Sequence, residues 1–484
     1  MNKTETPIKH HDGPCKLLLY PSILFMLVGM IVGTYLSYNA FVMPNAFSGE
    51  YVHFGRIRPV HVGTVTLLWL LPSGAGLMFY FVPRLCGIPL WSRTLGLVTG
   101  WVWWIALIVG IFSFPFGTNF GWEYAELPMW VGTWFSPKIL FNLGYVLFAV
   151  NLFVTIAKRK YKKMYVSLWY TMGTLLWTPI TFAISNYLIL LLPGGISRVN
   201  ANFFYVHNLV GLIFTPMGVA ASYYFIPKEA NTPLYSHKLS MIGFWSIAFI
   251  YSWVGAHHII HGPVSQWLQT MSIIFSIWLF IPVWTVVTNF FMTMKGQWHK
   301  YQQSVSIRFS MMGTVFYLIV CIQGPLQALR NVNEVTSKTD WIIGHAHMAL
   351  FGGFTFFALG GIYHAIPKML KRPFWSKSLG DWHFTLNLIG ALLMFLSLTV
   401  GGFLQGLSWA DWANGSSYAE FQKNISELSF LQTLASMHGW WTVRAISGLI
   451  IVVANALFVL NVFNTVVLKP KKSLTTEEKM GEPS

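Results

Sequence analysis

The chain has 484 residues, of which 55% are hydrophobic and only 10% are charged. This composition excludes an ordinary soluble protein and predicts an all-α, polytopic membrane protein. The formal net charge of +16 would suggest nucleic-acid binding in a soluble protein, but here the basic residues occupy short loops between apolar runs, so we expect no nucleic-acid partner. Three scattered cysteines without a C-x-x-C-H motif exclude a disulfide framework and a covalently attached c-type haem.

Apolar runs recur along nearly the whole chain, and each is long enough to cross a bilayer, which takes about 20 residues. They predict about twelve transmembrane helices embedded in membrane lipid. In chain order the predicted helices lie near 17–37, 59–83, 95–115, 140–158, 165–190, 203–226, 238–260, 271–294, 305–329, 341–366, 382–407 and 440–465. We therefore expect one membrane domain at 17–466, an N-terminal tail at 1–16 and a C-terminal tail at 467–484.

Basic residues set the predicted orientation. Loops after even-numbered helices carry most of them, as in "KRKYKK" at 158–163, and loops after odd-numbered helices carry few. By the positive-inside rule both termini are cytoplasmic, and even-numbered helices run from outside to inside. The first apolar run lacks a small-residue cleavage site, so we expect a retained helix rather than a signal peptide.

Six histidines fall at one predicted depth, in the outer third of the membrane. Four lie near the outer starts of even-numbered helices and two near the outer end of an odd-numbered helix: His61, His207, His345 and His347, and His257 and His258. A single such residue is often a hydrogen-bonded interfacial histidine. Neutral imidazole is, however, the commonest metal ligand, and six at one depth favour a layer of haem and metal sites.

Helix geometry divides this histidine layer. His345 and His347 are two residues apart and differ by about 200° around a helix, so they face opposite sides. One helix can therefore ligate two haems, and His61 could complete a bis-histidine, low-spin haem with one of the two.

The remaining three histidines, His207, His257 and His258, could hold one copper ion opposite the other haem. Tyr251 precedes His258 by seven residues, two turns of a helix, so its phenol is expected to project toward the same pocket. This arrangement predicts a haem with an open position for a gas.

None of the fifteen acidic residues lies well inside a predicted span. Proton movement would then depend on hydroxyls, amides and water, with Tyr223, Ser240 and Asn289 as candidates. The alternative for each is a polar tie between helices.

Charged residues also lie near the outer side of the haem layer. We expect Glu123 and Glu126 in "GWEYAELPMW" either to hold a calcium ion against haem propionates or to face solvent. Arg56, Arg58 and Arg444 lie on the same side, and a guanidinium pairs bidentately with carboxylates such as propionates. The alternative for the arginines is ordinary loop charge.

Several stretches carry a family resemblance: "FGRIRPVH", "EYAEL", "VHNLVG", "YYFIPKEANTPLYSHKLS", "YSWVGAHH", "GPLQALRNVN", "TDWIIGHAHMALFGG" and "VRAISG". In them the chain resembles subunit I of the C-family haem-copper oxidases, the cbb3-type cytochrome c oxidases. The resemblance implies the haem-copper oxidase subunit I fold and a terminal oxidase that reduces O₂ to water, coupled to proton translocation. It also implies cytochrome c as electron donor, membrane-anchored c-type cytochrome subunits as partners, and the bacterial cytoplasmic (inner) membrane.

The resemblance also implies roles for the histidines, the tyrosines, the proton-pathway candidates and the outer glutamates. His61 and His347 match the ligands of low-spin haem b, His345 matches the ligand of high-spin haem b, and His207, His257 and His258 match the ligands of copper B. Tyr251 matches a tyrosine that is crosslinked to the histidine at His207. Tyr223, Ser240 and Asn289 match a single K-like proton pathway, and Glu123 and Glu126 match the calcium and propionate region.

One position departs from the family pattern. Gln323 in "CIQGPLQ" stands where the family usually has a glutamate, near the proximal histidine of the high-spin haem. A neutral amide should make that imidazole a weaker donor and raise the haem potential.

Two other functions remain open. A nitric oxide reductase large subunit shares the six histidines but holds non-haem iron, helped by a glutamate four residues after the first metal-binding histidine, where this chain has Gly211. Copper is therefore favoured, although Gln323 and the phrase "HMALFGGF" resemble the reductases. A transporter or a haem-binding scaffold is the non-enzymatic alternative.

Overall fold

The computed structural model describes residues 8, 10–118, 127–411, 417–427 and 430–468. Within these ranges the fold is helical and contains no strand, as the sequence predicts. The helices are α1 (Gly13–Ser37), α2 (Phe54–Gly63), α3 (Leu71–Cys86), α4 (Arg93–Phe112), α5 (Pro137–Ala157), α6 (Val166–Ala183), α7 (Ile189–Leu191), α8 (Ile196–Asn208), α9 (Thr215–Ala230), α10 (His237–Ile250), α11 (Gln266–Trp278), α12 (Phe280–Thr293), α13 (His299–Gln303), α14 (Val305–Ala328), α15 (Arg330–Thr336), α16 (Asp340–His347), α17 (Phe356–Leu370), α18 (Lys377–Asp411), α19 (Tyr418–Glu427) and α20 (Phe430–Val467).

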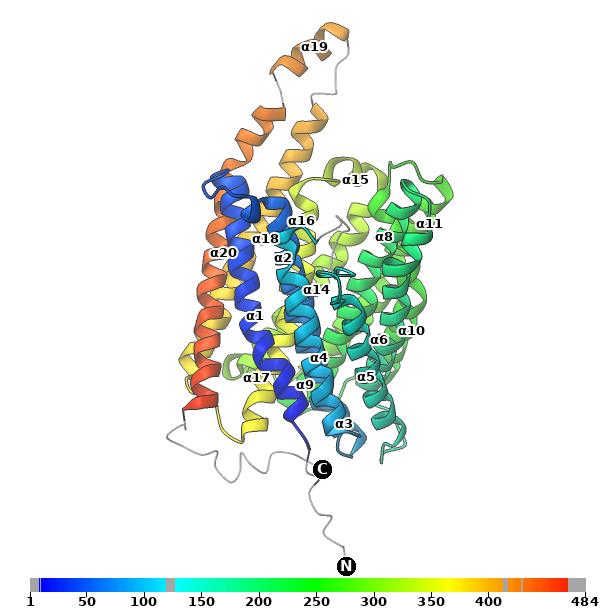
Figure 1. Cartoon of the computed structure of the whole chain (residues 1–484), viewed down its shortest axis with the longest axis vertical. Helices are drawn as coiled ribbons and strands as arrows, with labels where there is room; N and C mark the ends of the chain where they lie inside the picture. Colours follow the sequence, from blue (N-terminus) through cyan, green and yellow to red (C-terminus); the bar gives the residue numbers. More distant parts are fainter. Residues whose placement is uncertain (1–7, 9, 119–126, 412–416, 428–429, 469–484) are drawn as a thin grey trace, which may run out of the picture.

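The described residues contain 11 helical spans that are long and apolar enough to cross a membrane. The remaining predicted helix, near 165–190, corresponds to α6, which continues through a π-helical segment into α7. The start of α1 and the end of α20 lie at the same end of the bundle (Figure 1), as an even number of crossings requires. At the other end, the upper parts of α18 and α20 extend beyond the bundle and carry α19 (Figure 1).

An internal repeat organises the bundle. The segments "FYFVPRLCGIPLWSRTLG" (79–96), "YYFIPKEANTPLYSHKLS" (223–240) and "YHAIPKMLKRPFWSKSLG" (363–380) share a first aromatic residue, a proline followed by a basic residue, and a serine before the next helix. The first half of each segment ends one of the central helices α3, α9 and α17, and the serine precedes α4, α10 or α18. The fold therefore contains three copies of one helix–turn–helix unit.

The same side-chain contact closes the turn in each copy. An asparagine accepts a hydrogen bond from the backbone N–H of the serine and donates one to its carbonyl oxygen. The donor–acceptor distances are 3.1 and 2.8 Å for Asn151 with Ser92, 2.9 and 2.8 Å for Asn289 with Ser236, and 3.0 and 2.8 Å for Asn461 with Ser376. All three asparagines are fully buried. Each therefore ties a later helix (α5, α12 or α20) to the turn before α4, α10 or α18.

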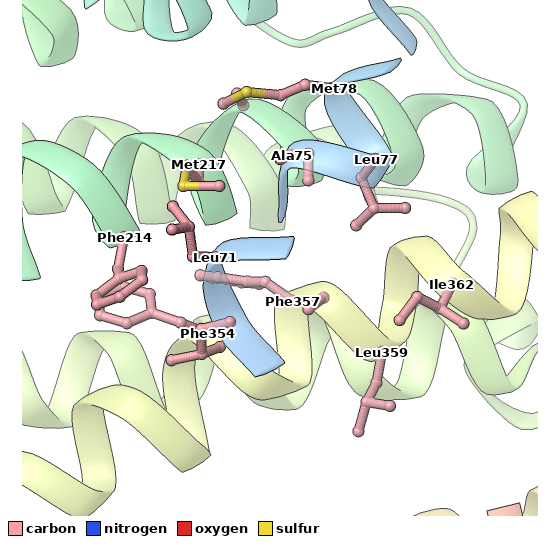
Figure 2. Close-up of a cluster of buried hydrophobic side chains, with 14 of the residues drawn as sticks. Leu71, Ala75, Leu77, Met78, Phe214, Met217, Phe354, Phe357, Leu359 and Ile362 are labelled. Carbon is pink, nitrogen blue, oxygen red and sulfur yellow. The ribbon is translucent and has the colours of Figure 1, made fainter. Parts of the chain in front are cut away.

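The central helices α3, α9 and α17 pack against one another and form the middle of the core. Figure 2 shows Leu77 of α3, Met217 of α9 and Phe357 of α17 among the side chains that meet there. Tyr80 and His364 occupy equivalent positions in two of the repeats, and their ring centroids are 6.2 Å apart.

π-helical segments follow three of the predicted metal-binding histidines. Thr64–Leu70 begins three residues after His61, Leu209–Phe214 begins two after His207, and Met348–Thr355 follows His347 directly. Prolines at 72 and 216 stand just after the first two segments, and a proline ring cannot accommodate the regular carbonyl four residues earlier. The widened turns are typical of functional sites, where they redirect side chains.

The predicted crossing at 238–260 corresponds to the span His237–Ile259, but its second half is not an α-helix. The α-helix α10 ends at Ile250, and the chain continues through two 3-10 segments, Tyr251–Trp253 and Gly255–Ile259. Tyr251 therefore does not lie two α-helical turns before His258, because the chain between them is not an α-helix.

Candidate haem and metal centre

His207, His257 and His258 form a compact group. One ring nitrogen from each lies within 4.8 Å of the others. His258 Nε2 is 3.2 Å from His207 Nδ1 and 3.0 Å from His257 Nε2. Three converging ring nitrogens suit a metal ion. Without a metal, a proton shared between two of the nitrogens leaves the third nitrogen without a hydrogen-bond partner. The group comes from two places, since His207 lies on α8 and the others on the 3-10 segment after α10.

Tyr251 lies directly against this group. Its ring stacks on that of His207, with a centroid distance of 4.3 Å and an interplanar angle of 21°. Gly211, four residues after His207, makes room for the phenol, since a Cβ built at Gly211 would overlap the Tyr251 ring. A side chain at position 211 and a tyrosine in this place therefore exclude each other.

A cavity of about 190 Å³ connects the three-histidine group to α16. Its lining includes His345 and Tyr251, together with Tyr317 and Cys321 of α14, which the sequence analysis did not predict. His345 Nδ1 lies 3.1 Å from Gln323 Oε1. An amide oxygen only accepts, so His345 donates from Nδ1 and keeps Nε2 free for a metal.

His61 and His347 face each other across a second cavity of about 200 Å³. Their ring centroids are 6.2 Å apart and the planes differ by 16°. Each ring donates from Nδ1 to a backbone carbonyl, His61 to Gly29 at 2.9 Å and His347 to Ile343 at 2.8 Å. Because Nδ1 of each ring donates, Nε2 of each carries no proton, and the pair could hold one metal through these nitrogens. His345 and His347 thus line different cavities from one helix.

The outer arginines divide into two sets. Arg58 and Arg444 line the His61–His347 cavity, and Arg444 Nη1 lies 3.9 Å from Asp340 Oδ1. Arg56 is bound elsewhere: it donates to the Pro115 carbonyl at 2.6 Å and pairs with Glu50 at 2.9 Å. The structure therefore does not bring Arg56 to the cavity lining. Glu123 and Glu126 lie outside the described residues.

The three proton-pathway candidates are buried, but they are not all linked. Asn289 Nδ2 lies 3.4 Å from the Tyr223 hydroxyl, in addition to its contacts with Ser236. The Ser240 hydroxyl donates to the carbonyl of His237 in its own helix, at 2.7 Å. Asn289 thus binds the Ser236 backbone, as its equivalents do in the other two repeats, and also contacts Tyr223.

Sequence reasoning missed two polar pairs. Ser276 lies 2.8 Å from His257 Nδ1, and Glu229 Oε1 lies 2.6 Å from His364 Nδ1. Nothing in the local sequence distinguishes Ser276 from other helix serines. The Glu229 pair had a signal, because His364 replaces the aromatic residue that the other two repeats have at its position.

Comparison with known proteins agrees with this geometry. Residues 14–450 match the model of the family described as Cytochrome C and Quinol oxidase polypeptide I. The chain is 30% identical over 456 residues to the Cbb3-type cytochrome c oxidase subunit CcoN1 of Stutzerimonas stutzeri, covering 92% of this chain and 93% of that protein. The chain belongs to the family of Cytochrome C and Quinol oxidase polypeptide I. The predicted family and the enzyme class, a cytochrome c oxidase subunit, are therefore confirmed.

Two further matches extend the comparison. The oxidase subunit is 29% identical over 487 residues to the Cytochrome c oxidase subunit 1 homolog of Azorhizobium caulinodans, covering 97% of this chain and 82% of that one. A solved heme-copper terminal oxidase dimer matches with a TM-score of 0.75 at 15% identity, covering 96% of this chain and 85% of that one, which shows the shared fold. Membership implies haem and copper as cofactors, and the two facing histidines and the three-histidine group fit them.

Proposed function

We propose that this oxidase subunit reduces O₂ to water at a centre of high-spin haem b and copper B, coupled to proton translocation. The contact between Tyr251 and His207 over Gly211 is the observation that carries the proposal. It supplies a phenol beside the three-histidine group, from which an electron and a proton can reach bound O₂.

The residues present suit the cofactors in distinct ways. His207, His257 and His258 would hold copper B, His345 would hold the high-spin haem b, and His61 with His347 would hold the low-spin haem b. The haem iron and copper supply the binding site and electrons for O₂ when bound. Arg58 and Arg444 offer positive charge for the propionates of the low-spin haem, as their place in the cavity lining supports.

Proton delivery and assembly complete the proposal. Tyr223, Ser240 and Asn289 would serve proton uptake from the cytoplasmic half, with both termini in the cytoplasm and the chain in the bacterial inner membrane. Electrons would come from cytochrome c through membrane-anchored c-type cytochrome subunits, because this chain carries no c-type haem motif. Glu123 and Glu126 remain predicted calcium ligands.

Gln323 would tune the high-spin haem. Its Oε1 accepts from His345 Nδ1 without a negative charge, so the imidazole gains less basicity than a carboxylate partner would give it. We expect a higher haem potential than with a glutamate at this position.

Nitric oxide reduction with non-haem iron is the second candidate, and the carboxamide at Gln323 favours it. The Tyr251 ring opposes it, because the glutamate that such an iron site uses at position 211 would overlap the phenol. Purification of the complex, with copper and iron measured per haem and turnover measured with O₂ and NO, tests both. One copper with fast O₂ reduction supports the oxidase; an extra non-haem iron with NO reduction would overturn it.

A further inference from the structure

We propose that Ser276 is a positioning residue for the copper site: it holds His257 in the tautomer that presents Nε2 to the metal. The inference rests on the proposed function, since it concerns a ligand of that site. Ser276 lies on α11, fully buried, and its Oγ is 2.8 Å from His257 Nδ1.

The direction of this hydrogen bond follows from a second contact. Ser276 Oγ is also 2.6 Å from the carbonyl oxygen of Ser272, one turn earlier in the same helix. A hydroxyl has one proton, and a carbonyl oxygen can only accept. The serine proton is therefore used on Ser272, and the Nδ1–H of His257 must donate to Ser276 Oγ.

This assignment leaves His257 Nε2 unprotonated on the side of the histidine group, 3.0 Å from His258 Nε2. A histidine binds a metal through a nitrogen that carries no proton. Its other nitrogen commonly donates to an acceptor that fixes the tautomer and the ring orientation. Ser276 has the geometry of such an acceptor.

His257 needs an outside anchor because of where it lies. It belongs to a short 3-10 segment, Gly255–Ile259, in which hydrogen-bond geometry is poorer than in an α-helix. His207, by contrast, lies in α8 and stacks on Tyr251, and His258 stacks on Phe203 with a centroid distance of 5.2 Å. The hydroxyl on α11 therefore connects the 3-10 segment to a regular helix.

Ser272 provides a matched control. It is also fully buried on α11, and its hydroxyl donates to the carbonyl of Gln269 at 2.8 Å. Replacing Ser272 with alanine removes a hydroxyl of the same helix without touching the histidine. A threonine–valine pair at position 276 adds a second control, because the two side chains have nearly the same shape and only threonine carries a hydroxyl.

The experiment uses the purified complex with Ser276→Ala, Ser276→Thr, Ser276→Val and Ser272→Ala. Copper retained per haem is measured against increasing concentrations of a copper chelator, and the haem spectra report assembly. Loss of an acceptor of this kind typically weakens metal binding 10–100-fold. We expect alanine and valine at 276 to release copper at 10–100-fold lower chelator concentration, and Ser276→Thr and Ser272→Ala to behave like the unmodified complex.

Equal copper retention in the threonine and valine variants overturns the inference, as does equal loss in Ser276→Ala and Ser272→Ala. If the alanine variant fails to assemble, the threonine–valine pair still decides. Failure of the proposed function gives a different result, because the unmodified complex would then contain another metal in place of copper. If the complex contains copper and turns over O₂, equal copper retention in the threonine and valine variants rejects only the role of Ser276.

Discussion

The structural and the functional role of Asn289 can be separated by comparison with the equivalent asparagines of the other repeats, Asn151 and Asn461. Replacing Asn289 with alanine removes both hydrogen bonds to Ser236. The half-buried N–H of Ser236 then loses its partner, whereas the Ser236 carbonyl keeps the hydrogen bond from the Ser240 N–H. One unsatisfied N–H costs about 1–3 kcal/mol when buried, so the expected loss is about 1–3 kcal/mol. Polar contacts between helices in membranes average only about 0.6 kcal/mol, which favours the lower end. Asn151→Ala and Asn461→Ala remove the same two bonds and should cost the same.

Only Asn289 adds a contact to the Tyr223 hydroxyl, at 3.4 Å. We therefore expect the three alanine variants to lower the thermal midpoint of the haem absorbance by similar amounts, and Asn289→Ala alone to slow O₂ turnover and proton uptake per haem. Equal slowing in Asn151→Ala or Asn461→Ala would refute the pathway role of Asn289. An unchanged thermal midpoint in all three variants would refute the stabilising role of the asparagine–serine hydrogen bonds.

Three further predictions address other contacts. Gly211→Ala should displace the Tyr251 ring at a cost of about 1–3 kcal/mol and abolish O₂ turnover, while the low-spin haem spectrum is kept. The control is Gly439→Ala, where an added Cβ meets nothing within 4 Å. Full O₂ turnover in Gly211→Ala would contradict the role of the Tyr251 ring. Gln323→Glu should lower the potential of the high-spin haem in a redox titration, and an unchanged or higher value would reject the tuning. Glu229→Ala removes the carboxylate that accepts from His364 Nδ1. The lost hydrogen bond should cost about 1–3 kcal/mol, toward the lower end because the Glu229 side chain is 22% exposed. A thermal midpoint equal to that of the exposed control Glu334→Ala would count against it.

Several features of this protein follow from the sequence alone. The helical fold is visible in apolar run lengths, because membrane crossing depends on the length and hydropathy of each segment by itself. The common depth of the six histidines, inferred from the basic loops, stays a prediction. The opposite faces of His345 and His347 follow from residue spacing on one helix, and the structure has them in two cavities. The three repeats could also have been found by comparing 79–96, 223–240 and 363–380. The asparagines that bind their serines lie outside these segments and appear only in the structure.

Tertiary structure decided what spacing could not. The end of α10 at Ile250, the ring of Tyr251 over Gly211, the contact of Arg56 with the Pro115 carbonyl and the acceptor role of Ser276 each depend on a residue far away in the chain or on a break in regular helix geometry. Depth in a membrane is fixed segment by segment, but rotation of one helix against another is fixed by packing between them. Side-chain contacts across helices therefore appear only once the bundle is assembled.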